Sequence, residues 1–278
     1  MVGGPELSWS AQQYVAFEDE RTRPVRDLLA AVPRIPARAV IDLGCGPGNS
    51  TENLAALFPA AVVSGIDSSE DMIRAARRRL PRVQFAVQDI EAWVSEAGDG
   101  STVRADTARA SGRVDVILAN AVLQWLPDHA RLLPALVGKL ASGGVLAVQM
   151  PDNLDEPAHR LMREVAAAGP WAAKLAAAAA ARPALASAAW YYELLRPLCA
   201  KVDLWRTTYH HPLPGGAAAV VEWFKGSGLL PFLEPLHTDE RAAYLKQYTT
   251  AISRAYPALA DGSVLLPFPR MFLVATVV

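Results

Sequence analysis

Cysteine is scarce in this sequence, with only two residues in 278, Cys45 and Cys199. Two cysteines cannot build a disulfide framework. We interpret Cys45, which lies inside a glycine-rich loop, as a small packing residue. Apolar residues make up 52% of the chain, which is ample for a buried sheet.

An excess of one charge is also lacking, because 27 Lys and Arg residues nearly balance 28 Asp and Glu residues. A net charge of −1 gives no general attraction for nucleic acid or for a membrane surface. We find no basic leader followed by an apolar run, and no apolar stretch of about 18 residues. We therefore expect a cytoplasmic protein with no nucleic-acid or membrane partner. A monomer is also expected.

Metal-ligand spacing is missing as well, since the five histidines form no pattern with cysteines or carboxylates. They are His129, His159, His210, His211 and His237. A catalytic triad and a reactive cysteine are equally absent from the pattern. We expect no metal.

The most informative stretch reads VIDLGCGPGNST, from Val40 to Thr51. An apolar strand-like run carries Asp42 at its end, and Gly44, Gly46 and Gly48 form the loop that follows. Asn, Ser and Thr then offer helix N-cap chemistry. Glycines permit tight turning and close approach of the backbone to a ligand. A strand, a glycine loop and a helix open a nucleotide-binding βαβ unit.

The spacing of these glycines argues against a dinucleotide. The fingerprint G-x-G-x-x-G needs its third glycine one residue later than Gly48. Asp42 would repel a pyrophosphate but suits a ligand that carries an ammonium and a sulfonium. The pattern resembles motif I of the class I S-adenosylmethionine methyltransferases, and nicotinamide-dependent oxidoreduction is disfavoured.

Three later apolar runs also end in a polar residue, at the carboxyl edge where open α/β sheets bind ligands. An acid about 20 residues beyond the glycine loop accepts ribose hydroxyls. Each could be an ordinary residue leaving a strand, but all of them at βαβ spacing indicate one site. The runs and their polar ends are Val62–Ile66 with Asp67, Val83–Val87 with Asp89, and Val114–Ala119 with Asn120.

These observations predict an α/β fold with a Rossmann-like class I methyltransferase sheet. We expect a mostly parallel sheet that ends in an antiparallel C-terminal hairpin, plus a helical cap. The predicted domains are lid helices over 1–36, a cofactor-binding core over 37–150, and cap segments with the last two strands over 151–278. Residues 97–113 are expected to be a surface insertion.

At the N-terminus, Ser8–Val32 has an amphipathic pattern that Pro24 interrupts, so we predict two helices that meet near Arg21–Pro24. In related methyltransferases an N-terminal helix closes the cofactor site. The resemblance therefore implies that Tyr14 and Phe17 cover the cofactor. It also implies that Asp89 meets the adenine amino group, with the neighbouring residues Ser68 and Ile90 in the same site.

Taken together, nine segments from about Trp9 to Ala275 resemble the trans-aconitate 2-methyltransferase family. The insertion at 97–113 and the alanine-rich stretch 171–189 depart from it. The resemblance implies transfer of a methyl group from S-adenosylmethionine to a carboxylate of trans-aconitate. The segments are Trp9, ERTRP at 20–24, DLGCGPGNST at 42–51, GIDSS at 65–69, LQWLPDH at 123–129, VQMPDN at 148–153, LMREV at 161–165, LWRTTYHH at 204–211 and FPRMF at 268–272.

Carboxylate methylation needs no general base, because a carboxyl group with a pKa near ~4 is already ionised at neutral pH. We therefore predict no catalytic residue in the strict sense and a mechanism of positioning. A tricarboxylate needs cations, and the planar fork of arginine fits a carboxylate best. The predicted substrate residues are Arg206, Arg270, Arg21, His210, Arg163, Trp125 and Gln149.

Arg206 and Arg270 lead this set because each lies in an apolar or aromatic run, where an unpaired charge would be costly. For Trp125, core packing and contact with the cofactor both stay open. Two other functions also stay open. One is methylation of another small acid, or of a phenol or amine, which would need a base. The other is cofactor binding without transfer.

Overall fold

The computed structural model describes residues 18–95 and 113–278, and side chains from residue 22 onward in the first of these ranges. The chain divides into two compact units. The core unit contains the described residues up to 150 together with 185–206 and 271–278. The helical unit contains residues 151–184 and 207–270.

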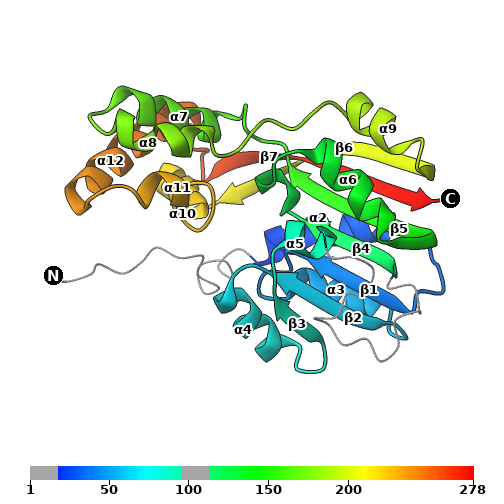
Figure 1. The fold of residues 1–278 in the computed structure, drawn as a ribbon. Coiled ribbons are helices and arrows are strands. Elements are labelled where there is room, and N and C mark those ends of the chain that lie inside the picture. The colour runs from blue at the N-terminus through cyan, green and yellow to red at the C-terminus, as the bar shows by residue number, and fades with distance from the viewer. Residues whose placement is uncertain (1–17, 96–112) are drawn as a thin grey trace. The chain divides into compact units, whose positions relative to one another are not determined.

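The core unit is built on a parallel sheet with the expected α/β pattern (Figure 1). β1 lies between β2 and β4, and its register pairs Asp42 with Gly65 on one side and with Leu118 on the other. Every strand predicted for this region is confirmed. They are β1 (Ala39–Leu43), β2 (Val62–Asp67), β3 (Gln84–Val87), β4 (Val114–Asn120) and β5 (Leu140–Pro151).

The helices of the core unit follow the strands in sequence, as the βαβ rhythm predicts. Two of them, α5 and α9, were not predicted. Asp128 Oδ1 caps α6 by accepting from the Arg131 N–H at 3.2 Å, and Ser69 Oγ caps α4. The elements are α2 (Glu18–Ala30), α3 (Asn49–Leu57), α4 (Glu70–Arg79), α5 (Ile90–Ser95), the 3₁₀ turn η1 (Leu123–Trp125), α6 (His129–Gly138) and α9 (Ala188–Leu195).

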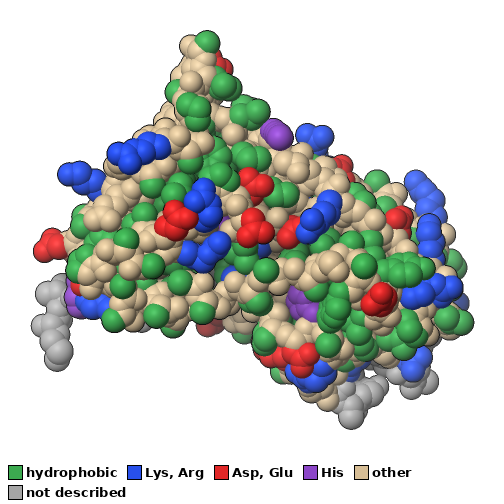
Figure 2. All heavy atoms as spheres, turned by 90° about the horizontal axis from the view of Figure 1, so that it is seen from above, with side chains coloured by type: hydrophobic (Ala, Val, Ile, Leu, Met, Phe, Trp, Pro, Cys, Tyr) green, Lys and Arg blue, Asp and Glu red, His purple; other side chains and the backbone are tan. Residues whose placement is uncertain are grey.

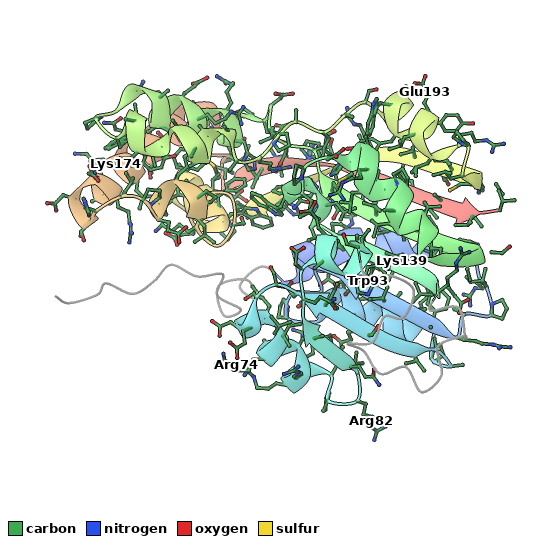
Figure 3. The ribbon with its side chains drawn as sticks, viewed as in Figure 1. Arg74, Arg82, Trp93, Lys139, Lys174 and Glu193 are labelled. Carbon is green, nitrogen blue, oxygen red and sulfur yellow. The ribbon has the colours of Figure 1, made fainter. Side chains whose placement is uncertain are left out.

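The short helix α5 forms because burial and a cap compensate for its length. Ile90 and Trp93 are buried in the apolar core. Lys139 Nζ lies 5.5 Å from the centroid of the Trp93 ring, and both side chains are labelled in Figure 3. Such a cation–π contact adds to the apolar burial of the indole. A six-residue segment has too little periodicity for sequence reasoning to detect.

The prediction of two helices meeting near Arg21–Pro24 is wrong for the described part of this segment. One helix, α2, runs through Pro24. A proline removes a single N–H from the helix ladder, and that cost is offset where an apolar helix face is buried. The buried face here comprises Val25, Leu28 and Leu29.

The last two strands, β6 (Cys199–Leu213) and β7 (Val264–Val277), complete a seven-stranded sheet of order β3-β2-β1-β4-β5-β7-β6. Within the core unit, the ring of Trp205 stacks on that of Phe272 with centroids 4.8 Å apart. Insertion of β7 between β5 and β6 departs from the dinucleotide-binding order, in which the sixth strand follows the fifth. The predicted antiparallel C-terminal strands are confirmed.

The helical unit packs its helices around α12, which contacts α7 and α10 (Figure 1). The Tyr244 hydroxyl donates to the Met162 carbonyl at 3.0 Å, and the Tyr248 hydroxyl donates to the Ala158 carbonyl at 3.1 Å. Buried phenols that donate in this way fix one helix against another. The helices are α7 (Pro157–Ala168), α8 (Ala172–Ala180), α10 (Gly216–Lys225), α11 (Leu230–Leu233) and α12 (Thr238–Ala255).

The alanine-rich helix α8 depends on its neighbours, because alanine buries little area. Trp171 and Leu175 are buried in the core of the helical unit, and Trp171 Nε1 donates to the Val165 carbonyl at 3.0 Å. Lys174, which is labelled in Figure 3, pairs through its Nζ with Glu240 of α12 at 2.5 Å. Trp190 does not belong to this core and packs against the apolar core of the core unit.

Charges of both signs are interspersed on the face shown in Figure 2. No helix within the described residues is long and apolar enough to cross a membrane.

Candidate active site

The glycines of the loop between β1 and α3 have positive φ angles, which residues with a side chain rarely adopt. Gly44, Gly46 and Gly48 have φ values of 64°, 53° and 94°. A Cβ built on Gly44 would lie 2.3 Å from Val122 Cγ2. One built on Gly46 would meet none of the described atoms within 4 Å. Gly44 is therefore required by packing, while the space beside Gly46 is open to a ligand.

Asp42 is fully buried at the end of β1, where it supports the start of α3. Its Oδ2 accepts from Ser50 Oγ and from Thr51 Oγ1, each at 2.7 Å. Its Oδ1 is buried and has no hydrogen-bond partner among the described residues. Burial raises the pKa of Asp42 to about 7 against the opposing effect of the two hydroxyls. A buried, orphaned carboxylate oxygen suits a cationic donor.

Asp67 ties the end of β2 to the glycine loop. Its Oδ2 accepts from the Gly46 N–H and its Oδ1 from the Ser69 N–H, both at 2.9 Å. Burial raises the pKa of this carboxyl group, and the two N–H donors oppose that rise. Each oxygen keeps a further lone pair, so the carboxylate can accept hydroxyl donors as well. Ser68 lies exposed beside it.

Asp89 and Ile90 have structural roles of their own. Asp89 is exposed, and its Oδ1 accepts from the Ala92 N–H at 3.0 Å at the start of α5. The Ile90 side chain is buried in the apolar core. The predicted contact of Asp89 with an adenine amino group would use its other oxygen, and it stays a prediction.

Asn120 ends β4 opposite Gln149 of β5, as the register of the two strands shows. Asn120 Oδ1 is buried and without a partner in the described part of the chain, and Gln149 is fully buried. Trp125 follows in η1 and is half-buried. Between them, Ala121 takes a positive φ of 57°, which is uncommon for a side-chain-bearing residue.

Sequence reasoning missed Gln124 at this strand end. Its Nε2 donates to the Ala121 carbonyl at 2.7 Å, while its Oε1 is buried without a partner among the described residues. The signal was available, because a glutamine in an otherwise apolar turn needs a hydrogen-bond partner.

Arg270 lies in the helical unit and is 4% exposed. The central carbon of its guanidinium lies 4.6 Å from the centroid of the Phe268 ring and 6.0 Å from that of Tyr209. A buried arginine whose plane lies over aromatic rings is held in orientation. This agrees with the predicted burial of Arg270 in an aromatic run.

Arg206 and His210 differ from Arg270, because both are exposed. Side chains alternate across a strand, so in this part of β6 the even-numbered residues share the exposed face. The expectation that Arg206 is buried is therefore wrong. The exposure of Arg206 and His210 does not test their predicted contacts with the substrate.

Arg163 lies on α7, half-buried, and its Nη2 donates to the Leu154 carbonyl at 2.8 Å. Arg182, which the sequence analysis missed, donates from Nη1 to Asn153 Oδ1 at 3.0 Å. Tyr14 and Phe17, and the side chain of Arg21, lie outside the described residues. Among the described residues, no three His, Cys, Asp or Glu side chains form a metal-binding group.

The side chains near the ends of β1, β2 and β4 are of the chemical types that bind S-adenosylmethionine. Asp42 and Asn120 each present a buried oxygen that lacks a partner among the described residues, and the loop leaves open space beside Gly46. Oxygen acceptors match the ammonium of the methionine part, and Asp67 matches the ribose hydroxyls.

The comparisons with known proteins agree with this class. A family described as "Methyltransferase domain" matches residues 16–199. The YcgJ protein of Bacillus subtilis aligns over 91% of this chain and 97% of its own, at 10% identity and a TM-score of 0.55. A phosphoethanolamine N-methyltransferase of Haemonchus contortus, solved with S-adenosylhomocysteine, aligns over 91% of this chain and 52% of its own, at 15% identity and a TM-score of 0.52. The protein is a class I methyltransferase that uses S-adenosylmethionine as methyl donor.

The curated relatives of this chain indicate which family of methyltransferases it belongs to. A protein of Rhodopseudomonas palustris strain BisB5 is 53% identical over 96% of this chain and 98% of its own. One of Methylobacterium radiotolerans is 54% identical over 96% of this chain and 97% of its own. Both are named trans-aconitate 2-methyltransferase. The chain belongs to the trans-aconitate 2-methyltransferase family.

Proposed function

We propose that this enzyme transfers the methyl group of S-adenosylmethionine to a carboxylate of trans-aconitate. The products are the monomethyl ester and S-adenosylhomocysteine. The observation that carries the proposal is the similarity over 96% of the chain to relatives named for this reaction. The glycine loop and Asp42 support the choice of donor.

S-adenosylmethionine supplies a methyl group bonded to a positively charged sulfur. Asp42 and Asn120 would hold its ammonium through their buried oxygens, and Asp67 would accept from the ribose hydroxyls. The glycine loop lets the backbone approach the cofactor closely. Ser68, Asp89 and Ile90 are the remaining proposed contacts of the core unit, and Tyr14 and Phe17 the proposed cover.

The acceptor carboxylate is ionised at neutral pH, so the enzyme does not have to remove a proton from it. The work of the protein is to hold the carboxylate in line with the methyl group, and positioning of this kind can lower a barrier by about 7–11 kcal/mol. Arg270 is the proposed anchor, since its guanidinium plane is fixed by two aromatic rings. The other proposed acceptor contacts are Arg206, Arg21, His210, Arg163, Trp125 and Gln149.

Mass spectrometry of a reaction with trans-aconitate and labelled S-adenosylmethionine tests this function. We expect one labelled monomethyl ester per S-adenosylhomocysteine released. A panel of other small acids, phenols and amines provides the control. Turnover of a panel member in preference to trans-aconitate would identify a different acceptor. Cofactor binding with no turnover of any acceptor would indicate a binding protein.

Arg270→Gln is expected to raise the KM for trans-aconitate by about tenfold or more, because it removes a charge-assisted hydrogen bond. Arg206→Gln, the matched change at an exposed arginine, tests the weaker of the two assignments and should raise KM by less. Steady-state kinetics gives both values, and S-adenosylhomocysteine affinity serves as the folding control. Equal KM values for Arg270→Gln and the wild type would exclude Arg270 from the site.

The monomeric state and the cytoplasmic location are also part of the proposal. The nearly balanced charge of the chain supports the absence of a nucleic-acid partner.

A further inference from the structure

In the core unit, Gln124 is a buried polar side chain whose amide is only half satisfied. The residue is 4% exposed. Its Nε2 donates to the Ala121 carbonyl at 2.7 Å, which leaves the carbonyl oxygen Oε1 as the other end of the amide. Oε1 is buried and has no partner among the described residues. A buried acceptor of this kind costs free energy unless a ligand group or a water donates to it.

The backbone around Gln124 places this amide beside the glycine loop. β4 pairs with β1 up to the residue before Asn120, so Asn120 comes level with the start of the loop. Val122 lies so close to Gly44 that a Cβ built on that glycine would be 2.3 Å from Val122 Cγ2. The Gln124 amide is bonded to Ala121, which lies between Asn120 and Val122 along the chain. The amide is therefore at the strand end that carries the candidate cofactor site.

The 3₁₀ turn η1, which carries Gln124, is also held by His129 of α6. His129 Nε2 donates to the Leu123 carbonyl at 2.9 Å, since a carbonyl oxygen can only accept. His129 Nδ1 lies 2.7 Å from the hydroxyl of Tyr191, which is fully buried on α9. Hydrogen bonds at Ala121 and at Leu123 thus fix the turn on both sides of Gln124. A ligand that donates to an acceptor fixed in this way has little ordering of the turn to offset.

The chemistry of Oε1 decides which ligand group can bind it. An amide oxygen only accepts, whereas trans-aconitate with its carboxylates ionised has no donor to offer. The cofactor has donors in its adenine amino group, its ribose hydroxyls and its ammonium. The proposed ribose contact, Asp67, ends β2, and the proposed adenine contact, Asp89, follows β3. In the order of the sheet, β1 separates both of these strands from β4. The ammonium is therefore the donor that matches the β4 side of the site.

We propose that Gln124 is a positioning and specificity residue whose Oε1 accepts a hydrogen bond from the ammonium of S-adenosylmethionine. This inference rests on the proposed function, in which Asp42 and Asn120 hold the same ammonium. Each of these two residues presents a buried oxygen without a partner in the described part of the chain. With Gln124, each N–H of the ammonium has an acceptor. Asn49 Oδ1 is likewise buried without a described partner, but it lies at the start of α3 and is not assigned to this group.

The test compares S-adenosylhomocysteine with its deaminated analogue, in which hydrogen replaces the amino group of the homocysteine part. Isothermal titration calorimetry gives the affinity of the wild type, Gln124→Met and Gln124→Glu for both ligands. Methionine keeps the length of the side chain and removes Oε1, whereas glutamate keeps an acceptor oxygen and loses the amide N–H₂. Gln247→Met is the matched control, because Gln247 is an exposed glutamine on α12.

Gln124→Met is expected to weaken the binding of S-adenosylhomocysteine by about tenfold, the loss of one charge-assisted hydrogen bond. It should leave the affinity for the deaminated analogue unchanged, because that ligand has no ammonium to lose. Gln124→Glu should recover most of the affinity for S-adenosylhomocysteine, since an acceptor oxygen remains. Gln247→Met should match the wild type with both ligands.

An unchanged affinity for S-adenosylhomocysteine in Gln124→Met would overturn the inference. An equal loss for both ligands would also overturn it, because a damaged turn weakens the whole cofactor site without regard to the amino group. If the analogue binds the wild type too weakly to measure, Gln124→Glu decides, and an affinity as low as that of Gln124→Met overturns the inference. A wild type that binds S-adenosylhomocysteine but makes no ester from trans-aconitate would refute the proposed function and leave the comparison at Gln124 intact.

Discussion

Asp42→Asn is expected to weaken binding of S-adenosylmethionine and S-adenosylhomocysteine by about 100-fold, the loss of a buried ionic hydrogen bond. Asp42 Oδ1 is buried and has no partner in the described part of the chain, which leaves it available to a cationic donor. Asparagine keeps an acceptor for Ser50 and Thr51 but places a neutral N–H₂ where that oxygen lies. Isothermal titration calorimetry with both ligands measures the loss.

The same substitution should raise the stability of the ligand-free protein at high pH. The pKa of Asp42 is raised from 3.8 to about 7 in the folded state. Where a folded-state pKa is raised, the unfolded chain ionises first, so stability falls as pH rises from about 4 to about 7. The loss is on the order of 4 kcal/mol, and asparagine abolishes it. Melting curves should show the variant gaining on the wild type across this window.

Asp115→Asn is the matched control, since Asp115 is another buried aspartate of the sheet. Its Oδ2 accepts from the Arg38 N–H at 2.7 Å and from the Ala39 N–H at 3.1 Å, at the opposite end of β1 from Asp42. This variant should lose stability and keep its ligand affinity. Unchanged ligand affinity in Asp42→Asn would remove Asp42 from the cofactor site, whatever its melting curve showed.

The parts of the fold that could be predicted are those determined by residues that lie close together along the chain. The run from Val40 to Thr51 contains its own strand, its turn residues and its N-cap chemistry, so the βαβ opening could be identified without tertiary information. Asp67, Asp89 and Asn120, which lie at or just after the ends of later strands, could then be assigned to the same edge of the sheet. Parallel strands place their carboxyl ends on one edge.

The failures depend on tertiary context. Arg206 and Arg270 both lie in apolar runs, but alternation along β6 directs Arg206 to solvent, while Arg270 is covered by aromatic rings. Arg182 follows a run of alanines, and these neighbours along the chain do not indicate which groups its guanidinium contacts. Only the fold brings it to Asn153. The helix through Pro24 likewise persists because its face is buried.

Gly46→Ala and Gly44→Ala are expected to fail in different ways. Both positions have a positive φ, where an L-residue costs about 1–2 kcal/mol. At Gly44 the new methyl would also meet both Cβ and Cγ2 of Val122, at 2.6 and 2.3 Å, so the strand ends must shift. We expect Gly44→Ala to lower the free energy of unfolding by a further ~3 kcal/mol.

At Gly46 the methyl would enter the space that is open to the cofactor, since no described atom lies within 4 Å of it. Gly46→Ala should therefore melt only a few degrees below the wild type. Its affinity for S-adenosylhomocysteine should nevertheless fall by about 100-fold, because overpacking a bound ligand costs as much as overpacking a core. Denaturant unfolding and calorimetry on the two variants separate these effects. Normal affinity in Gly46→Ala would mean that the cofactor does not pass this glycine, and the binding geometry inferred from the loop would then have to be abandoned, since Gly44 already has a packing reason to be glycine.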